Sequence, residues 1–127
     1  MTKTTRFISV EITIRTDAEC DEWIEWFEQQ DNCVNKIADK ESKWHVYFDP
    51  IPSADANKTI FDLCAAIEKL PGSVRRHWDN ANKREFHIGY DVGDEPHWYD
   101  QHLELETLQR AVKLNASIRI AMYATSD

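Results

Sequence analysis

The sequence predicts an α+β fold: a two-layer sandwich in which about three helices cover one face of a mostly antiparallel or mixed four-stranded sheet. Segments with period-two apolar alternation are separated by segments with apolar residues at helical spacing, in the order β-α-β-α-β-α-β. The predicted strands alternate in polarity instead of being apolar throughout, which is typical of a sheet covered on one face only. With 127 residues, the chain fits a single domain, residues 1–127.

The first part of the chain predicts a strand, an acidic helix and a second strand. Residues 6–15 alternate isoleucine or valine with polar residues, which indicates a half-buried strand. Residues 16–30 place apolar side chains at i, i+3, i+4 and i+7 from Cys20, which predicts an amphipathic helix. Residues 31–43 are polar and predict a loop or a weak edge strand. Residues 44–49 alternate in polarity again and predict the second strand.

The middle of the chain predicts a helix, a connection and a third strand. Apolar residues at helical spacing predict a helix over 55–70, which Pro71 ends. Residues 73–83 are basic, and we expect an irregular connection there. Residues 84–90 alternate in polarity and predict the third strand, which a long loop over 91–102 follows.

The last part of the chain predicts a helix and the final strand. The helix covers residues 104–114, and its spacing predicts four inward side chains: Leu105, Leu108, Ala111 and Val112. The strand covers residues 117–124. Its alternation predicts three side chains on one face: Ile118, Ile120 and Met122.

Four stretches of this sequence resemble one known group of proteins. They are SKWHVYF, a helix that ends in KLPG, FHIGYDVGDEPHWY, and LELETLQRAVKLNASIRIAMYA. Over roughly residues 42–124 the chain resembles a family of small, uncharacterised bacterial α+β domains (a domain of unknown function) of immunity-protein-like character. The resemblance implies an α+β fold and a bacterial or phage setting, and it implies no catalytic residues. The tryptophan-rich acidic helix at 16–30 lies outside it.

Composition excludes several function classes. The chain has only three glycines, so the glycine-rich loops that bind phosphates or dinucleotides are absent. Its three cysteines form no C-x-x-C pair, which removes the usual zinc and thiol-redox signals. No apolar run reaches membrane-spanning length, and no signal peptide is evident at the start. We therefore expect a cytoplasmic protein with no cofactor, no membrane partner and no enzymatic activity.

Charge is distributed unevenly along the chain, whose formal net charge is −8. Residues 16–32 hold seven acidic residues and no lysine or arginine, and residues 91–106 hold six acidic residues and again no lysine or arginine. Basic residues gather in 69–84. Such acidic surfaces attract basic proteins and repel nucleic acid, so we expect a basic protein partner and no direct nucleic-acid binding.

Each acidic segment combines carboxylates with aromatic side chains. In the first helix, Trp26 falls beside the acidic face and away from the core stripe. Tryptophan is a favoured interface anchor, and complementary charge speeds association. The predicted partner-binding residues are Glu19, Glu22, Glu25, Trp26 and Glu28, together with Glu95, Trp98 and Asp100. The alternatives are that Trp26 packs at the edge of a solvated acidic face, and that one acidic segment neutralises residues 69–84 within the fold.

These observations predict a small acidic inhibitor of the immunity-protein type, which occludes a basic site on a toxin or nucleic-acid-handling protein. One alternative is an anti-defence protein that mimics nucleic acid. Another is a metal-dependent enzyme or metal-binding protein that uses the loop 87–102, where His87, His97 and His102 accompany several acids. The sequence leaves strand order and homo-oligomeric state open.

Overall fold

The structure is a computed structural model that describes residues 3–125. Helices and strands alternate along most of the chain. The elements are β1 (Arg6–Thr16), α1 (Asp21–Gln29), β2 (Asn35–Ala38), β3 (Trp44–Phe48), α2 (Ala56–Glu68), α3 (Gly72–Asp79), β4 (Lys83–Val92), α4 (Leu105–Lys113) and β5 (Ser117–Ala124).

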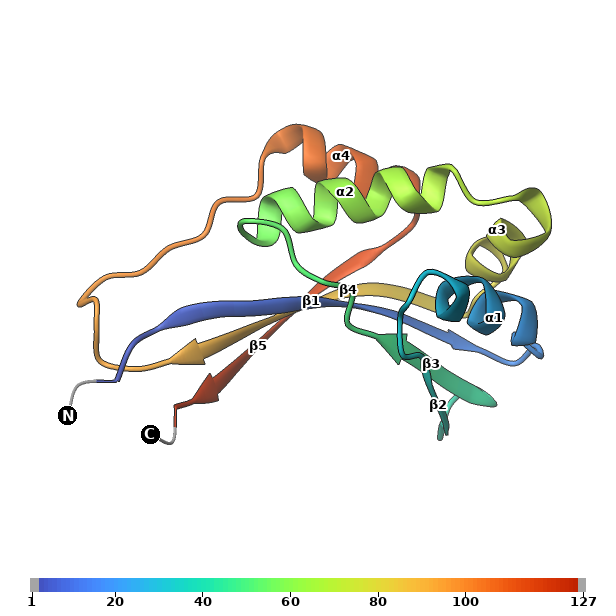
Figure 1. Ribbon diagram of the computed structural model, residues 1–127, viewed down its shortest axis with the longest axis horizontal. Coiled ribbons are helices and arrows are strands. Elements are labelled where there is room, and N and C mark those ends of the chain that lie inside the picture. Colours follow the sequence, from blue (N-terminus) through green and yellow to red (C-terminus); the bar gives the residue numbers. More distant parts are fainter. Residues whose placement is uncertain (1–2, 126–127) are drawn as a thin grey trace.

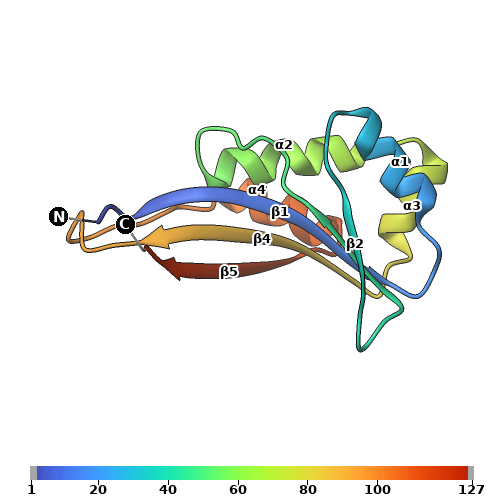
Figure 2. The same ribbon diagram turned by 60° about the horizontal axis from the view of Figure 1, so that its bottom comes forward.

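The strands form one mixed sheet in the order β2-β3-β1-β4-β5 (Figure 1). Neighbouring strands are antiparallel except β4 and β5, which run parallel. The helices lie on one side of this sheet, and the other side is left open (Figure 2). The predicted α+β class with a mixed sheet is therefore confirmed.

The predicted number of elements is wrong in two places. Within residues 3–125 the sheet has five strands rather than four, because the polar segment 31–43 contains the short edge strand β2. The same residues form four helices rather than three, because the expected irregular connection 73–83 contains most of α3. Val74 and Trp78, one helical turn apart, are the buried side chains of α3. Two apolar positions make a stripe too short for the pattern to reveal this helix.

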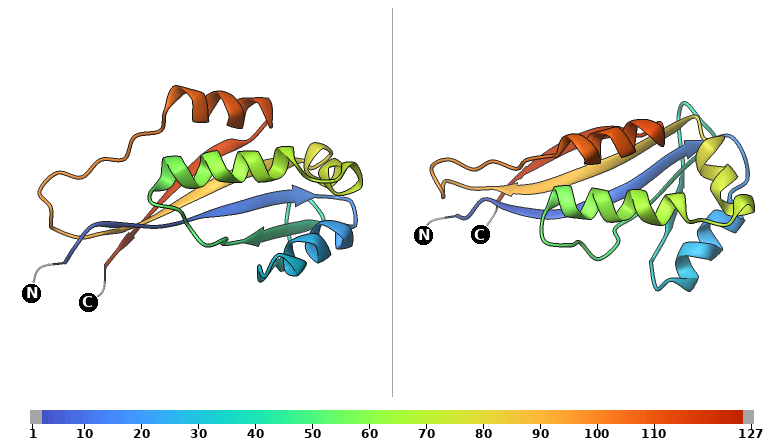
Figure 3. Two further views of the ribbon diagram at one scale, coloured as in Figure 1. Left: turned by 45° about the horizontal axis from the view of Figure 1, so that its top comes forward. Right: turned by 90° about the horizontal axis from the view of Figure 1, so that it is seen from above.

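Alternation along β1 explains how the sheet separates its two faces. Val10, Ile12 and Ile14 are buried in the hydrophobic core. The residues between them, such as Glu11, pair across the open face, where Glu11 lies opposite His87 of β4. Polar residues on the open face and apolar residues on the covered face are what a half-covered sheet requires. Figure 3 shows α2 and α4 lying along the covered face.

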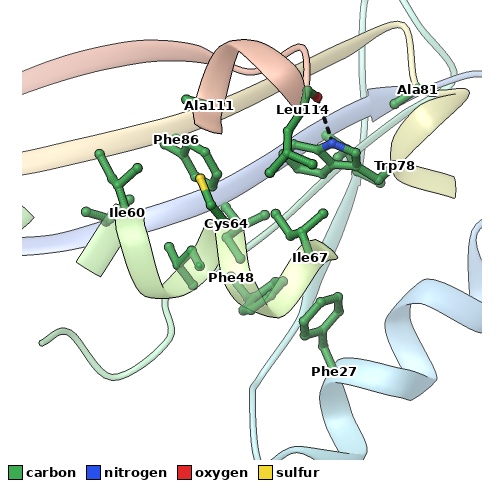
Figure 4. Close-up of a cluster of buried hydrophobic side chains, with 14 of the residues drawn as sticks. Phe27, Phe48, Ile60, Cys64, Ile67, Trp78, Ala81, Phe86, Ala111 and Leu114 are labelled. Atoms are coloured by element: carbon green, nitrogen blue, oxygen red, sulfur yellow. Dashed lines mark hydrogen bonds between the residues drawn. The ribbon is translucent and has the colours of Figure 1, made fainter. Parts of the chain in front are cut away.

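Trp78 joins three parts of the core (Figure 4). It is fully buried, and its ring stacks on that of Trp23 in α1 at 5.9 Å between centroids. Its indole Nε1 donates a hydrogen bond of 2.9 Å to the carbonyl oxygen of Leu114 at the end of α4. One side chain of α3 therefore ties α1 and α4 to the sheet.

The expected inward face of α4 is partly wrong. Ala111 is buried as predicted, but Leu105 and Val112 are exposed, and Leu108 lies at the border of exposure. The helix instead turns Thr107, Ala111 and Leu114 toward the sheet. Within the helix, the small Thr107 and Ala111 lie against the sheet, and the larger Leu105 and Val112 remain outside.

Within residues 3–125, no helix is long and apolar enough to cross a membrane.

Candidate protein-binding surface

Much of the acidity of α1 is neutralised within the fold. Glu19, just before α1, accepts a hydrogen bond of 2.5 Å from Nζ of Lys43 and lies 3.6 Å from Nζ of Lys36. The hydrogen bond from Lys43 lowers the pKa of the Glu19 carboxyl. A carboxylate held in this way by two lysines offers little unbalanced charge to a partner.

Glu22 is also paired, and its partners come from the basic segment. Its Oε1 lies 3.0 Å from Nε2 of His77 and 3.6 Å from a guanidinium nitrogen of Arg76, both in α3. The hydrogen bond with His77 is the main cause that lowers the pKa of Glu22. At this position, α1 partly neutralises residues 69–84, the arrangement considered above as the alternative to a partner-binding face.

Glu25 and Glu28 differ from these residues. Both are exposed, and neither has an ion pair within the described part of the chain. Trp26 is half-buried and packs against the core. It lines a hollow of about 310 Å³ between α1 and α2, together with Leu63 and Leu70. The geometry of Trp26 therefore resembles that of a residue at the edge of the core more than that of a protruding anchor.

The loop between β4 and α4 holds the other predicted set. Trp98 is 78% exposed, and Glu95 and Asp100 on either side are exposed as well. In residues 3–125, neither carboxylate has an ion pair with a lysine, arginine or histidine. We call these three residues, Glu95, Trp98 and Asp100, the loop surface.

Backbone hydrogen bonds fix this loop at both ends. The carbonyl oxygen of Glu95 accepts from the amide of Thr5 at 2.6 Å. The side chain of Gln101 accepts from the amide of Ala56 at 3.2 Å, and the amide of Glu104 donates to the side chain of Asn57 at 2.8 Å. A loop held in this way loses less conformational entropy when a partner binds.

A groove of about 380 Å³ lies beneath the loop. Apolar side chains line most of it, including Tyr90 on the sheet and Tyr99 in the loop, and Asp100 and His97 provide polar groups. Burial raises the pKa of Tyr90 above its ordinary value of 10.0, so ionisation of its hydroxyl is even less favourable than usual. The groove therefore offers a partner apolar contact with carboxylates nearby.

The two predicted sets are not brought together. Figure 1 shows α1 at one end of the molecule and the loop between β4 and α4 at the other. Glu19, Glu22, Glu25, Trp26 and Glu28 therefore lie far from Glu95, Trp98 and Asp100. A single compact partner-binding patch cannot include both.

The candidate metal ligands are separated as well. His87 lies on β4, opposite Glu11, with Nδ1 of His87 3.6 Å from a carboxylate oxygen of Glu11. His97 and His102 are exposed in the loop. Among residues 3–125, no group of three or more histidine, cysteine or acidic side chains is arranged to hold a metal ion.

The sequence reasoning missed two features of the surface. The first is a hollow of about 170 Å³ on the open face, lined by Glu11, Asp49, His87 and Tyr123 among others. Burial and the charge of Asp49 raise the pKa of Glu11 there. Pairing of β1 with β4 creates this hollow, and no local pattern in the sequence indicates it.

The second missed feature is an exposed apolar surface on α4 and β5. It comprises Leu105, Leu108, Val112, Ile120 and Met122, and we call it the α4/β5 surface. A signal for it was present: apolar residues cover about 180° of α4 at 100° per residue, wider than the roughly 100° stripe that one contact needs. The apolar arc is therefore wider than the side that α4 turns toward the sheet, and its outer part remains exposed.

The fold and its surfaces describe an acidic α+β domain with an exposed tryptophan in a loop that borders an apolar groove. Comparison with protein-family models, with curated proteins and with solved structures finds no match to this chain.

Proposed function

We propose that the protein is a small acidic protein-binding inhibitor of the immunity-protein type. Its partner is a basic toxin or a basic nucleic-acid-handling protein, whose active or binding site it occludes. The loop surface would make the contact. The observation that supports this proposal most is Trp98, which is 78% exposed between two carboxylates that lack ion pairs in the described chain.

The chemistry of the loop surface fits a basic partner. A tryptophan side chain can bury on the order of 200 Å² on contact and is a frequent energetic anchor of interfaces. Glu95 and Asp100 would pair with lysine or arginine side chains around the site of that anchor. The groove beneath the loop would receive an apolar side chain of the partner. Charge complementarity would speed encounter, and the bound domain would block the site sterically.

The α1 end supports the proposal less strongly. Glu19 and Glu22 already bind lysines or α3 side chains. Glu25 and Glu28 have no ion pair within residues 3–125, but Trp26 beside them is half-buried. The α1 end therefore provides a control surface. Like the loop surface it presents two carboxylates, but its tryptophan is less exposed than Trp98.

The experiment is a pull-down with the tagged protein from a lysate of the cells that produce it, at low and at high salt. The test variant combines Glu95→Gln, Trp98→Ser and Asp100→Asn. The control variant combines Glu25→Gln with Glu28→Gln. It also removes two negative charges, but from α1 at the opposite end of the molecule. We expect one basic protein to be retained by the wild type and by the control at low salt, and at least tenfold less by the test variant.

Other outcomes would contradict the proposal. Equal loss from both variants would show that net charge alone retains the protein. Full retention by the test variant would place the contact elsewhere.

A further inference from the structure

We propose that a second copy of this chain docks on the α4/β5 surface and forms a two-fold symmetric dimer through the free edge of β5. This inference goes beyond the proposed function, because it concerns a different partner. The two surfaces adjoin, since Ile120 and Met122 also line the groove beneath the loop. Four of the five side chains on this surface are more than half exposed: Leu105 at 71%, Val112 at 70%, Ile120 at 56% and Met122 at 71%. Single exposed aliphatic residues are common, but a contiguous group on adjoining elements marks an interaction site.

The arrangement of the elements makes this group continuous. Helix α4 leads directly into β5, and the two run in opposite directions along the same edge of the sheet (Figure 3). Ile118, Ile120 and Met122 share the covered face with Phe86, Ile88 and Tyr90, their register partners on β4. Ile118 is half-buried, and the next two apolar residues on this face of β5 are exposed.

The outer edge of β5 has the properties of a pairing edge. The strand has eight residues, and within residues 3–125 it pairs with β4 on one side only, so its other side presents backbone groups with no strand partner there. Proteins usually protect such an edge with charges, prolines or bulges. β5 contains no proline, and its one charged residue, Arg119, donates two hydrogen bonds to Glu85, of 3.0 and 3.1 Å.

The opposite edge of the sheet is different. β2 has only four residues and carries Lys36, which lies near the carboxylates of Glu19 and Asp21. A short, charged strand is a protected edge. The contrast indicates that β5 is the edge open to a partner.

The pattern on β5 suits a second copy. A two-fold axis through Ile120 makes two β5 strands antiparallel, with Ile120 opposite itself and Ile118 opposite Met122 of the other copy. Both pairs are apolar and lie on the covered face. On the open face, Arg119 faces Ala121, so no two like charges meet directly. The edge is about 26 Å long, comparable with the width of an interface that buries about 800 Å² on each partner.

Charges on α4 fit the same symmetry. Glu104 and Glu106 lie at the beginning of α4, and Lys113 lies at its end. The same axis sets the two α4 helices antiparallel on one side of the joined sheet, so that each acidic end approaches the basic end of the other copy. A basic partner fits this surface less well, because β5 carries no carboxylate and Glu85 beside it is paired with Arg119.

The test measures the mass of the full chain in solution by sedimentation equilibrium over a range of protein concentrations. We expect the wild type to have twice the chain mass at high concentration. Ile120→Lys and Ile120→Glu each place two like charges face to face, so each variant alone is expected to be monomeric. An equal mixture of the two should restore the dimer, because lysine then faces glutamate across the axis.

Controls separate this interface from others. Val112→Lys, on α4, should weaken the dimer independently of β5, and its exposed position leaves the fold intact. Ile37→Lys changes a 48% exposed isoleucine on β2 and should leave the dimer intact at 0.15 M salt. A monomeric wild type, a dimer that survives both Ile120→Lys and Val112→Lys, or a mixture that stays monomeric would each overturn the proposal. No partner protein is needed, so this result is independent of the pull-down.

Discussion

At the residue scale, burial gives two tryptophans different roles. Trp78 is fully buried and donates to the carbonyl oxygen of Leu114, whereas Trp98 is largely exposed. Trp78→Phe should lower the free energy of unfolding by about 2–4 kcal/mol, because it leaves a cavity and an unsatisfied carbonyl. Trp98→Phe should change it by less than about 0.5 kcal/mol. Urea unfolding followed by circular dichroism measures both. Similar effects of the two changes would contradict the assigned roles.

The environment of Glu11 predicts how the stability of the fold depends on pH. Burial and Asp49 raise the pKa of Glu11 in the folded state above its ordinary value of 4.5. The folded state therefore binds this proton more tightly than the unfolded state. Its stabilising contribution is complete below the ordinary pKa and is lost as the pH rises through the folded pKa. Glutamine resembles the protonated form, so Glu11→Gln should raise the melting temperature near neutral pH.

The comparison across pH tests this assignment. The advantage of Glu11→Gln over the wild type should shrink as the pH falls below about 4, where Glu11 is protonated in both states. Glu25→Gln is the matched control, since Glu25 is exposed and has no ion pair in residues 3–125. A constant difference between Glu11→Gln and the wild type at all pH values would show that titration of Glu11 is not its cause.

Residue-level exposure was the least predictable property of the candidate site. Cys20, Trp23 and Phe27 are buried as their spacing indicates, because one stripe dominates that helix. The partners of Glu19 and Glu22 come from elements distant in sequence, so no local pattern could reveal them. The exposure of Trp98 follows from its place in a polar loop and was easier to foresee.

At the element scale, the beginning of α2 offers a direct test. Asp55 is its N-cap, and its carboxylate accepts a hydrogen bond of 2.8 Å from the amide of Lys58. Asp55→Ala should cost about 1 kcal/mol of stability, because that amide loses its acceptor. Asp55→Asn keeps the acceptor and should cost little. Thermal unfolding measures both variants, and an equal loss in the two would mean that charge, rather than capping, matters at this helix end.

Elements with long, regular patterns were predictable, and short ones were not. β1, α2, β4 and β5 lie within a few residues of their expected positions. The helix α3 escaped prediction because only Val74 and Trp78 mark its buried side. For α4 the position was right and the inward face was partly wrong, since its apolar arc is wider than the side that it turns toward the sheet. Periodicity shows that a helix is amphipathic, but it does not show which apolar residues the sheet will cover.

At the scale of the whole molecule, strand order decides which surfaces exist. β1 and β4 are antiparallel, so α1, which follows β1, and the acidic loop, which follows β4, lie at opposite ends of the molecule. The parallel crossover from β4 makes β5 an edge strand. None of this follows from local sequence, because pairing between strands far apart in the chain sets it. The charge map along the sequence was correct, but its two acidic segments form separate surfaces.

Net charge predicts opposite salt effects on the two proposed interactions. Two copies of charge −8 whose centres are roughly 30 Å apart repel by on the order of 10 kcal/mol in unscreened water. The Debye length falls from about 30 Å at 0.01 M salt to about 8 Å at 0.15 M, which removes most of this repulsion. The exposed ion pairs between the α4 ends lose at most about 1 kcal/mol each over the same range. Added salt therefore weakens the repulsion between the two copies more than it weakens the ion pairs that attract them.

We accordingly expect the dissociation constant of the dimer to fall severalfold between 0.01 and 0.15 M salt, while binding of a basic partner weakens. Sedimentation equilibrium measures the first effect, and the association rate with the captured partner measures the second. The Ile37→Lys variant reduces the net negative charge without touching β5, so its dimer should depend less steeply on salt. If salt weakened the dimer as well, ion pairs rather than the apolar α4/β5 surface would hold the two copies together.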